Sequence, residues 1–212
     1  MSVNGAATST TDALTLVLAN SGTVDYDSIV LADVETLTVN VTEVTASTNI
    51  RAATIGLSTS QQTGGAAQTL NVTGTESLTI DTAVTMGTID ASGMTVAATT
   101  DAGLAMSSSA TVAQTITGSG KVDTLYGSTK ADTIDAGAGN DAIHASTGAD
   151  TIDGGAGTDT LHTTGMVSTN IEGSGTGEST GVVINMGTTD VTLATVFGAT
   201  TQYLGAGDTV VS

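Results

Sequence analysis

Five aspartates recur at intervals of nine residues between Gly118 and His162, each in the same surroundings. They are Asp123, Asp132, Asp141, Asp150 and Asp159. In every nine-residue unit, small residues crowd the first four places, Asp takes the sixth, and Leu or Ile takes the eighth. The units, which follow one another without insertion, are GSGKVDTLY, GSTKADTID, AGAGNDAIH, ASTGADTID and GGAGTDTLH. Carboxylates at so regular a spacing are suited to binding cations, provided that the chain folds back on itself with the same period.

Each unit has the residues that a turn and a short strand require. Small residues let the backbone reverse where a Cβ would clash. In the triplet around the eighth place, side chains alternate, so only the Leu or Ile points inward. Two units therefore make one coil of eighteen residues, which places Asp123, Asp141 and Asp159 along one side. Asp132 and Asp150 lie along the other.

Stacked carboxylates need a counter-charge. Strands in adjacent coils lie about 4.8 Å apart, so two such carboxylates repel each other by roughly 4 kcal/mol at an intermediate dielectric. A hard divalent cation removes this repulsion. Calcium, with six to eight oxygen ligands, fits better than magnesium, which prefers a smaller octahedron and keeps its waters. The pairs expected to share an ion are Asp123 with Asp141, Asp132 with Asp150, and Asp141 with Asp159.

The predicted sites differ in quality. Lys121 and Lys130 occupy the fourth place of the first two units, where the pattern asks for glycine. The turns beside Asp141 and Asp159 fit the pattern best, so this pair is expected to be the strongest site. The metal-binding residues predicted in addition to the five aspartates are Gly137, Gly139, Gly148, Gly155 and Gly157. A disordered linker rich in Gly and Asp is the competing interpretation, and the strict period with its apolar eighth place argues against it.

Residues 118–162, called the repeat segment below, resemble the repeats of the RTX (repeats-in-toxin) family. The resemblance covers about a fifth of the chain. It implies a calcium-binding β-roll and export from Gram-negative bacteria by a one-step, type I route, with folding where calcium is abundant. It identifies a module and no activity, because proteases, lipases, toxins, adhesins and surface-layer proteins resemble one another here.

Composition excludes several classes of function. The chain has 21 acidic and 3 basic residues, for a net charge of −18, which argues against nucleic acid or an anionic membrane as partner. Proline, cysteine and tryptophan are absent and aromatic residues make up 2% of the chain, so the core must be built from aliphatic side chains. No apolar run approaches the length that spans a membrane, and no cleavable signal is visible.

Alternating apolar residues predict short strands before the repeat segment, as at Leu14, Leu16 and Leu18 or at Leu37, Val39 and Val41. The phrase VETLTVN at 34–40 returns as TESLTID at 75–81. The expected fold class is all-β, a right-handed parallel β-solenoid that leads into the calcium-binding roll. A β-sandwich is the alternative for the first part. The expected division is an irregular solenoid or sandwich over 1–112, the roll over 113–162, and a C-terminal β cap with a possible type I export signal over 163–212.

Three classes of function compete. The first is a structural, calcium-dependent, self-assembling surface-layer protein or domain, because the chain is Thr-rich β structure without a catalytic constellation and its two related phrases resemble alphaproteobacterial RTX surface-layer proteins. The second is a calcium-triggered folding and export module of a larger secreted enzyme, toxin or adhesin. The third is an enzyme, which we do not expect. The first implies a secreted protein at the cell surface whose partners are calcium ions, further copies in a homo-oligomer or two-dimensional lattice, and a cell-surface polysaccharide.

Overall fold

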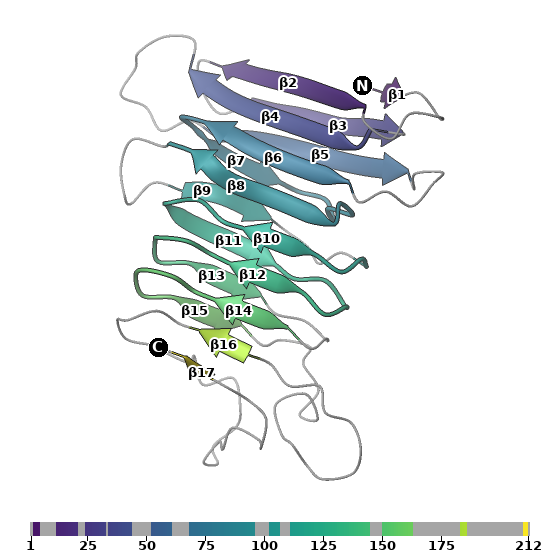
Figure 1. The fold of residues 1–212 in the computed structure, drawn as a ribbon. Coiled ribbons are helices and arrows are strands. Elements are labelled where there is room, and N and C mark those ends of the chain that lie inside the picture. Colours follow the sequence, from purple (N-terminus) through teal and green to yellow (C-terminus); the bar gives the residue numbers. More distant parts are fainter. Residues whose placement is uncertain are drawn as a thin grey trace.

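The structure, a computed structural model, describes residues 2–4, 12–20, 24–32, 34–43, 52–60, 68–95, 102–106, 111–144, 150–162, 183–185 and 210–211. In these ranges the regular secondary structure consists of β-strands. Up to residue 185, successive described strands alternate between two sheets that face each other, so that each coil adds one strand to each sheet (Figure 1). The chain is therefore a two-sided solenoid, with its N-terminal strands at one end of the stack.

The two sheets are named here by their strands. Sheet A contains β1 (Ser2–Asn4), β3 (Val24–Ala32), β5 (Ala52–Ser60), β7 (Ser77–Ile80), β9 (Ala102–Met106), β11 (Val122–Tyr126), β13 (Ala142–His144) and β15 (Thr160–His162). Sheet B contains β2 (Ala13–Asn20), β4 (Thr36–Glu43), β6 (Thr69–Gly74), β8 (Thr88–Met94), β10 (Thr115–Thr117), β12 (Thr133–Asp135), β14 (Thr151–Asp153), β16 (Val183–Asn185) and β17 (Val210–Val211).

Every strand pairing described between these elements is parallel. A sandwich would pair its strands antiparallel, so this alternative is wrong and the predicted parallel solenoid is confirmed. The related phrases VETLTVN and TESLTID supply β4 and β7, which lie in opposite sheets. The expected domain boundaries at residues 112/113 and 162/163 stay predictions. Sheet B runs across both positions.

Coil length varies before the repeat segment and becomes constant within it. In sheet B, Ala13 pairs with Thr36, Thr36 with Thr69, Thr69 with Thr88, and Thr88 with Thr115, which are separations of 23, 33, 19 and 27 residues. From Thr115 to Thr133 and from Thr133 to Thr151 the separation is 18 residues. Beyond this stretch the separation is irregular again, since Thr151 pairs with Val183, so the predicted eighteen-residue coil is the regular part of an otherwise irregular solenoid.

The core lies between the sheets and is aliphatic, as the composition requires. In the repeat segment each strand buries one large side chain, such as Leu125, Ile143 and Leu161 in sheet A. Upstream strands are longer and bury more; β4 alone buries Leu37, Val39 and Val41. Strands shorten from eight residues in β4 to three in β12, so the solenoid tapers toward its C-terminal end (Figure 1).

From the predicted C-terminal cap, the structure describes β16 and β17, which extend sheet B beyond β14. The rest of residues 163–212 lies outside the described ranges. Among the described residues, no helix has the length and apolar character needed to cross a membrane.

Candidate metal centre

The five repeated aspartates lie in the two predicted files. Strand register places Asp123, Asp141 and Asp159 at the start of neighbouring strands of sheet A, and Asp132 and Asp150 at the same place in sheet B. All five are buried, with at most 2% of their surface exposed. Because a buried carboxylate loses its hydration, each must find hydrogen-bond donors or a cation within the fold.

A hydrogen-bond ladder connects the aspartates along each file. The backbone N–H of Asp123 donates to Oδ1 of Asp141 at 2.8 Å, and that of Asp141 donates to Oδ1 of Asp159 at 3.0 Å. In the other file, the N–H of Asp132 donates to Oδ1 of Asp150 at 3.0 Å. The three pairs inferred from the eighteen-residue spacing are therefore in direct contact.

The second carboxylate oxygen divides the aspartates into two classes. Oδ2 of Asp141, Asp150 and Asp159 is buried and has no hydrogen-bond partner. A buried charged oxygen without a partner bears the full cost of desolvation, which is about 1–3 kcal/mol or more. In Asp141–Asp159 both members carry such an oxygen, whereas the other two pairs contain one each. The pair that the glycine pattern ranks first thus also presents the most open ligand atoms.

Asp123 and Asp132 are instead saturated by two serines that the sequence reasoning missed. Ser119 donates its N–H to Asp123 Oδ2 at 2.7 Å and its hydroxyl to the same carboxylate at 2.9 Å. Ser128 serves Asp132 in the same way, at 2.5 Å from its N–H and 2.8 Å from its hydroxyl. Both serines occupy the second place of their unit, four residues before the aspartate. The serine alone is no distinguishing signal, because Ser146 holds the same place before Asp150, whose Oδ2 has no partner.

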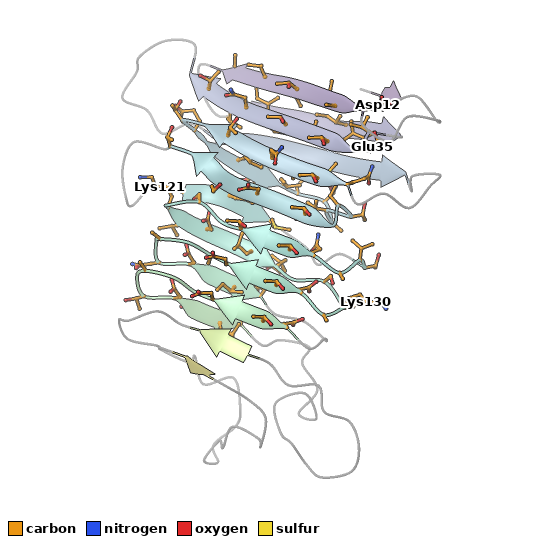
Figure 2. The ribbon with its side chains drawn as sticks, in the orientation of Figure 1. Asp12, Glu35, Lys121 and Lys130 are labelled. Atoms are coloured by element: carbon orange, nitrogen blue, oxygen red, sulfur yellow. The ribbon has the colours of Figure 1, made fainter. Side chains whose placement is uncertain are left out.

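The same serines hold the turns that carry the two lysines. The backbone N–H of Lys121 donates to Ser119 Oγ at 3.1 Å, and that of Lys130 donates to Ser128 Oγ at 2.9 Å. Figure 2 shows both lysines on outer turns of the solenoid. In these two turns, serine hydroxyls make the hydrogen bonds. The third and fifth units have Gly137 and Gly155 at the place of the serines.

Glycine is required where the later turns stack. Gly137 and Gly155 adopt φ values of +95° and +80°, which side chains other than glycine rarely tolerate. A Cβ on Gly155 would collide with the carbonyl oxygen of Gly137 one coil away. Gly139 and Gly157 likewise have positive φ and stack in the same manner. Gly148, the remaining predicted glycine, lies outside the described residues.

The donor set fits calcium. Within the described part of the chain, no three acidic or histidine side chains converge on one point. A cation at these pairs would therefore need further oxygen ligands besides the carboxylates, such as backbone carbonyls. Oxygen-only ligation of this kind suits calcium rather than a transition metal.

Burial sets the ionisation of these carboxylates. It raises the pKa of Asp141 to about 7, with the charges of Asp123 and Asp159 adding to the effect against the hydrogen bond from the Asp123 N–H. Burial also raises the pKa of Asp123 and of Asp150 to about 6, and it raises that of Asp159. Carboxylates that resist ionisation in the folded chain are groups that gain from a nearby divalent charge.

The outer face of sheet A carries an aromatic ladder at the ninth place of alternate units. The Tyr126 and His144 rings are stacked with centroids 4.0 Å apart, and the His144 and His162 rings with centroids 4.3 Å apart. Burial, followed by the charge of His162, lowers the pKa of His144. The three rings stack because these residues are directly paired on adjacent strands and point outward. The stack therefore lies on a different face from the buried aspartates.

Comparison with known protein families identifies the repeats of this segment. Residues 117–152 and 140–165 match the family model described as the RTX calcium-binding nonapeptide repeat (4 copies). This segment belongs to the RTX family. RTX nonapeptide repeats bind calcium ions, and proteins that carry them are typically secreted by type I systems. Neither a curated protein nor a solved structure matches the chain.

Asp141 contacts an aspartate on each side, so its removal should affect two RTX sites. We expect Asp141→Ala to lower the number of calcium ions bound per chain by more than Asp159→Ala or Asp123→Ala, measured by equilibrium dialysis at saturating calcium. Asp135→Ala is the matched control, because Asp135 is an exposed residue of the same segment and its loss changes the net charge equally. Equal losses for Asp141→Ala and Asp123→Ala would contradict the shared-ion arrangement.

The raised pKa values predict how the calcium-free chain responds to pH. Because Asp141, Asp123 and Asp150 bind protons more tightly folded than unfolded, folding takes up protons between the ordinary aspartate pKa near 4 and about 7. Stability without calcium should be highest at the acidic end of this window and fall as pH rises to about 7. Circular dichroism in calcium-depleted buffer should show β content increasing as pH is lowered from 7.5 to 5.

The double variant Asp141→Asn, Asp150→Asn should show a weaker pH dependence, since the amides do not titrate. With calcium present the trend should reverse, because protons compete for the same oxygens. If the β content of the calcium-free wild-type chain decreased as pH was lowered from 7.5 to 5, these carboxylates would not govern folding.

Proposed function

We propose that the chain is a structural, self-assembling protein or domain of a bacterial surface layer, exported by a type I system and folded by calcium, and that it is not an enzyme. The observation that carries the proposal is the pair of uninterrupted parallel sheets, which make the described part of the chain one continuous scaffold (Figure 1). Such a solenoid offers long, regular faces on which further copies can pack.

The acidic files explain why folding would wait for calcium. The chain carries a net charge of −18, and the RTX segment buries five aspartates behind a core of one large apolar side chain per strand. Without a counter-charge, the open Oδ2 atoms of Asp141, Asp150 and Asp159 oppose burial. Calcium, when bound, supplies that charge and adds its binding free energy to folding.

This dependence fits export through a one-step route. Sites of the weak extracellular class, with dissociation constants of roughly 10⁻⁴–10⁻³ M, would stay empty in a bacterial cytosol and fill outside the cell. The aspartates would then keep the chain expanded before export and compact after it. Calcium-dependent folding would serve any secreted RTX protein, so it supports secretion more strongly than it supports a role in a surface layer.

Support for assembly comes from the N-terminal end of the stack. At this end, β2 is the outermost described strand of sheet B and β1 is the outermost described strand of sheet A. Val17 on β2 is 56% exposed, and the neighbouring Leu14 and Leu16 are only partly buried. No described strand pairs with this edge of sheet B, and a parallel edge with exposed apolar residues is a surface to which another strand can add; head-to-tail addition extends without closing.

Electron microscopy tests the proposal. The purified chain in millimolar calcium should form sheets, tubes or filaments, and calcium chelation should disperse them and lower the β content seen by circular dichroism. Asp141→Ala should raise the calcium concentration needed for both changes, whereas Asp135→Ala should not. Monodisperse particles at every calcium concentration, with calcium-dependent folding intact, would reject self-assembly and favour a folding and export module of a larger secreted protein.

A further inference from the structure

The first two turns of the RTX segment, which carry Lys121 and Lys130 in Figure 2, hold their aspartates differently from the later turns. Both oxygens of Asp123 accept hydrogen bonds from the backbone: Oδ1 from the N–H of Leu104 at 2.6 Å, and Oδ2 from the N–H of Ser119 at 2.7 Å. The Ser119 hydroxyl lies 2.9 Å from each of these oxygens and donates to the carboxylate. The chain itself therefore supplies the donors that this buried carboxylate needs.

Asp132 repeats this arrangement in the other file. Its Oδ1 accepts from the backbone N–H of Gln114 at 2.7 Å and from the hydroxyl of Ser128 at 2.8 Å. Its Oδ2 accepts from the N–H of Ser128 at 2.5 Å. Leu104 and Gln114 both precede the repeats in the chain, so these two carboxylates also connect the RTX segment to the irregular solenoid before it.

The three later aspartates of the RTX segment do not have this second set of donors. In each, Oδ1 accepts from the N–H of the aspartate one coil nearer the N-terminus, whereas Oδ2 is buried without a hydrogen-bond partner. They are Asp141, Asp150 and Asp159. In the fifth unit the N–H at the second place is directed elsewhere, since Gly155 donates to Asp153 Oδ1 at 3.0 Å.

Serine could not take the same part in the third and fifth units. Gly137 and Gly155 hold the place that Ser119 has in the first unit, and their φ values of +95° and +80° disfavour any residue with a Cβ. A Cβ on Gly137 would also lie 2.2 Å from the carbonyl oxygen of Ser119 in the stack. These later turns are therefore built to stack closely and leave the second carboxylate oxygen open.

The serine bonds and a bound calcium ion meet the same need, because both place positive charge beside a buried carboxylate. A turn whose carboxylate is already satisfied gains less from the ion and needs less of it to close. We propose that Ser119 and Ser128 make the response of the RTX segment to calcium stepwise. The turns of Asp123 and Asp132 close at a lower calcium concentration than the turns of the three later aspartates. This inference rests on the calcium-dependent folding in the proposed function and not on assembly.

Residue-resolved hydrogen exchange during a calcium titration of the full chain tests this order. In the wild type, the N–H groups of Ser119 and Ser128 should become protected at a calcium concentration about tenfold below the one that protects the N–H of Asp141, which donates to Asp159. The double variant Ser119→Gly, Ser128→Gly should lose this step, so that residues 119 and 128 need as much calcium as Asp141. Glycine holds the same place in the third and fifth units, so the variant should fold at saturating calcium.

Ser146→Gly is the matched control, because it makes the same change at the same place before Asp150, whose Oδ2 has no partner. The step should persist in this variant. A single calcium midpoint for Ser119, Ser128 and Asp141 in the wild type would overturn the proposal, and so would a step of wild-type size in the double variant. If the double variant did not fold, a step of wild-type size at Ser119 and residue 128 in Ser128→Ala would overturn it instead. Loss of any calcium-induced protection in the wild type would reject calcium-dependent folding as well.

Discussion

The narrow half of this solenoid depends on one hydrogen bond, repeated from coil to coil. In it, the backbone N–H of one aspartate donates to the carboxylate of the aspartate one coil further on. It links the turns in register, since the carboxylates of Asp141, Asp150 and Asp159 each accept from the aspartate one coil nearer the N-terminus. It also brings like charges into a buried stack, where desolvation and mutual repulsion raise their pKa values. The same contact therefore specifies the fold and opposes it until a counter-charge is present.

The chain satisfies its buried turn groups in three ways along the stack. Serine hydroxyls and N–H groups saturate Asp123 and Asp132, and glutamine amides satisfy carbonyls further toward the N-terminus. The third way, a cation, is open to Asp141, Asp150 and Asp159, whose Oδ2 atoms are buried without a hydrogen-bond partner. Which way a turn uses is decided by one or two side chains, so the dependence on calcium can differ from coil to coil within one continuous sheet.

The parallel solenoid could be predicted from the sequence for the whole molecule, but the neighbours within the stack could be predicted only for its regular part. A constant period of nine residues fixes which apolar residues point inward and which aspartates adjoin, as Ile143 and Asp141 show. The roles of Ser119 and Ser128 escaped because a hydroxyl in a turn signals flexibility as readily as a hydrogen bond. The alignment of the upstream strands could not be predicted, because paired residues of sheet B are separated by 23, 33, 19 and 27 residues before the period settles.

The taper gives the molecule a direction. A coil near β4 buries several aliphatic side chains per strand, while a coil near β12 buries one, so apolar burial contributes progressively less per coil toward the C-terminal end. In a stack whose coils contact only their neighbours, each coil's stability adds to that of the next, and unravelling starts where the increment is smallest. A falling calcium concentration should accordingly unfold the narrow RTX coils before the broad N-terminal coils, which remain as a template on which the rest can refold.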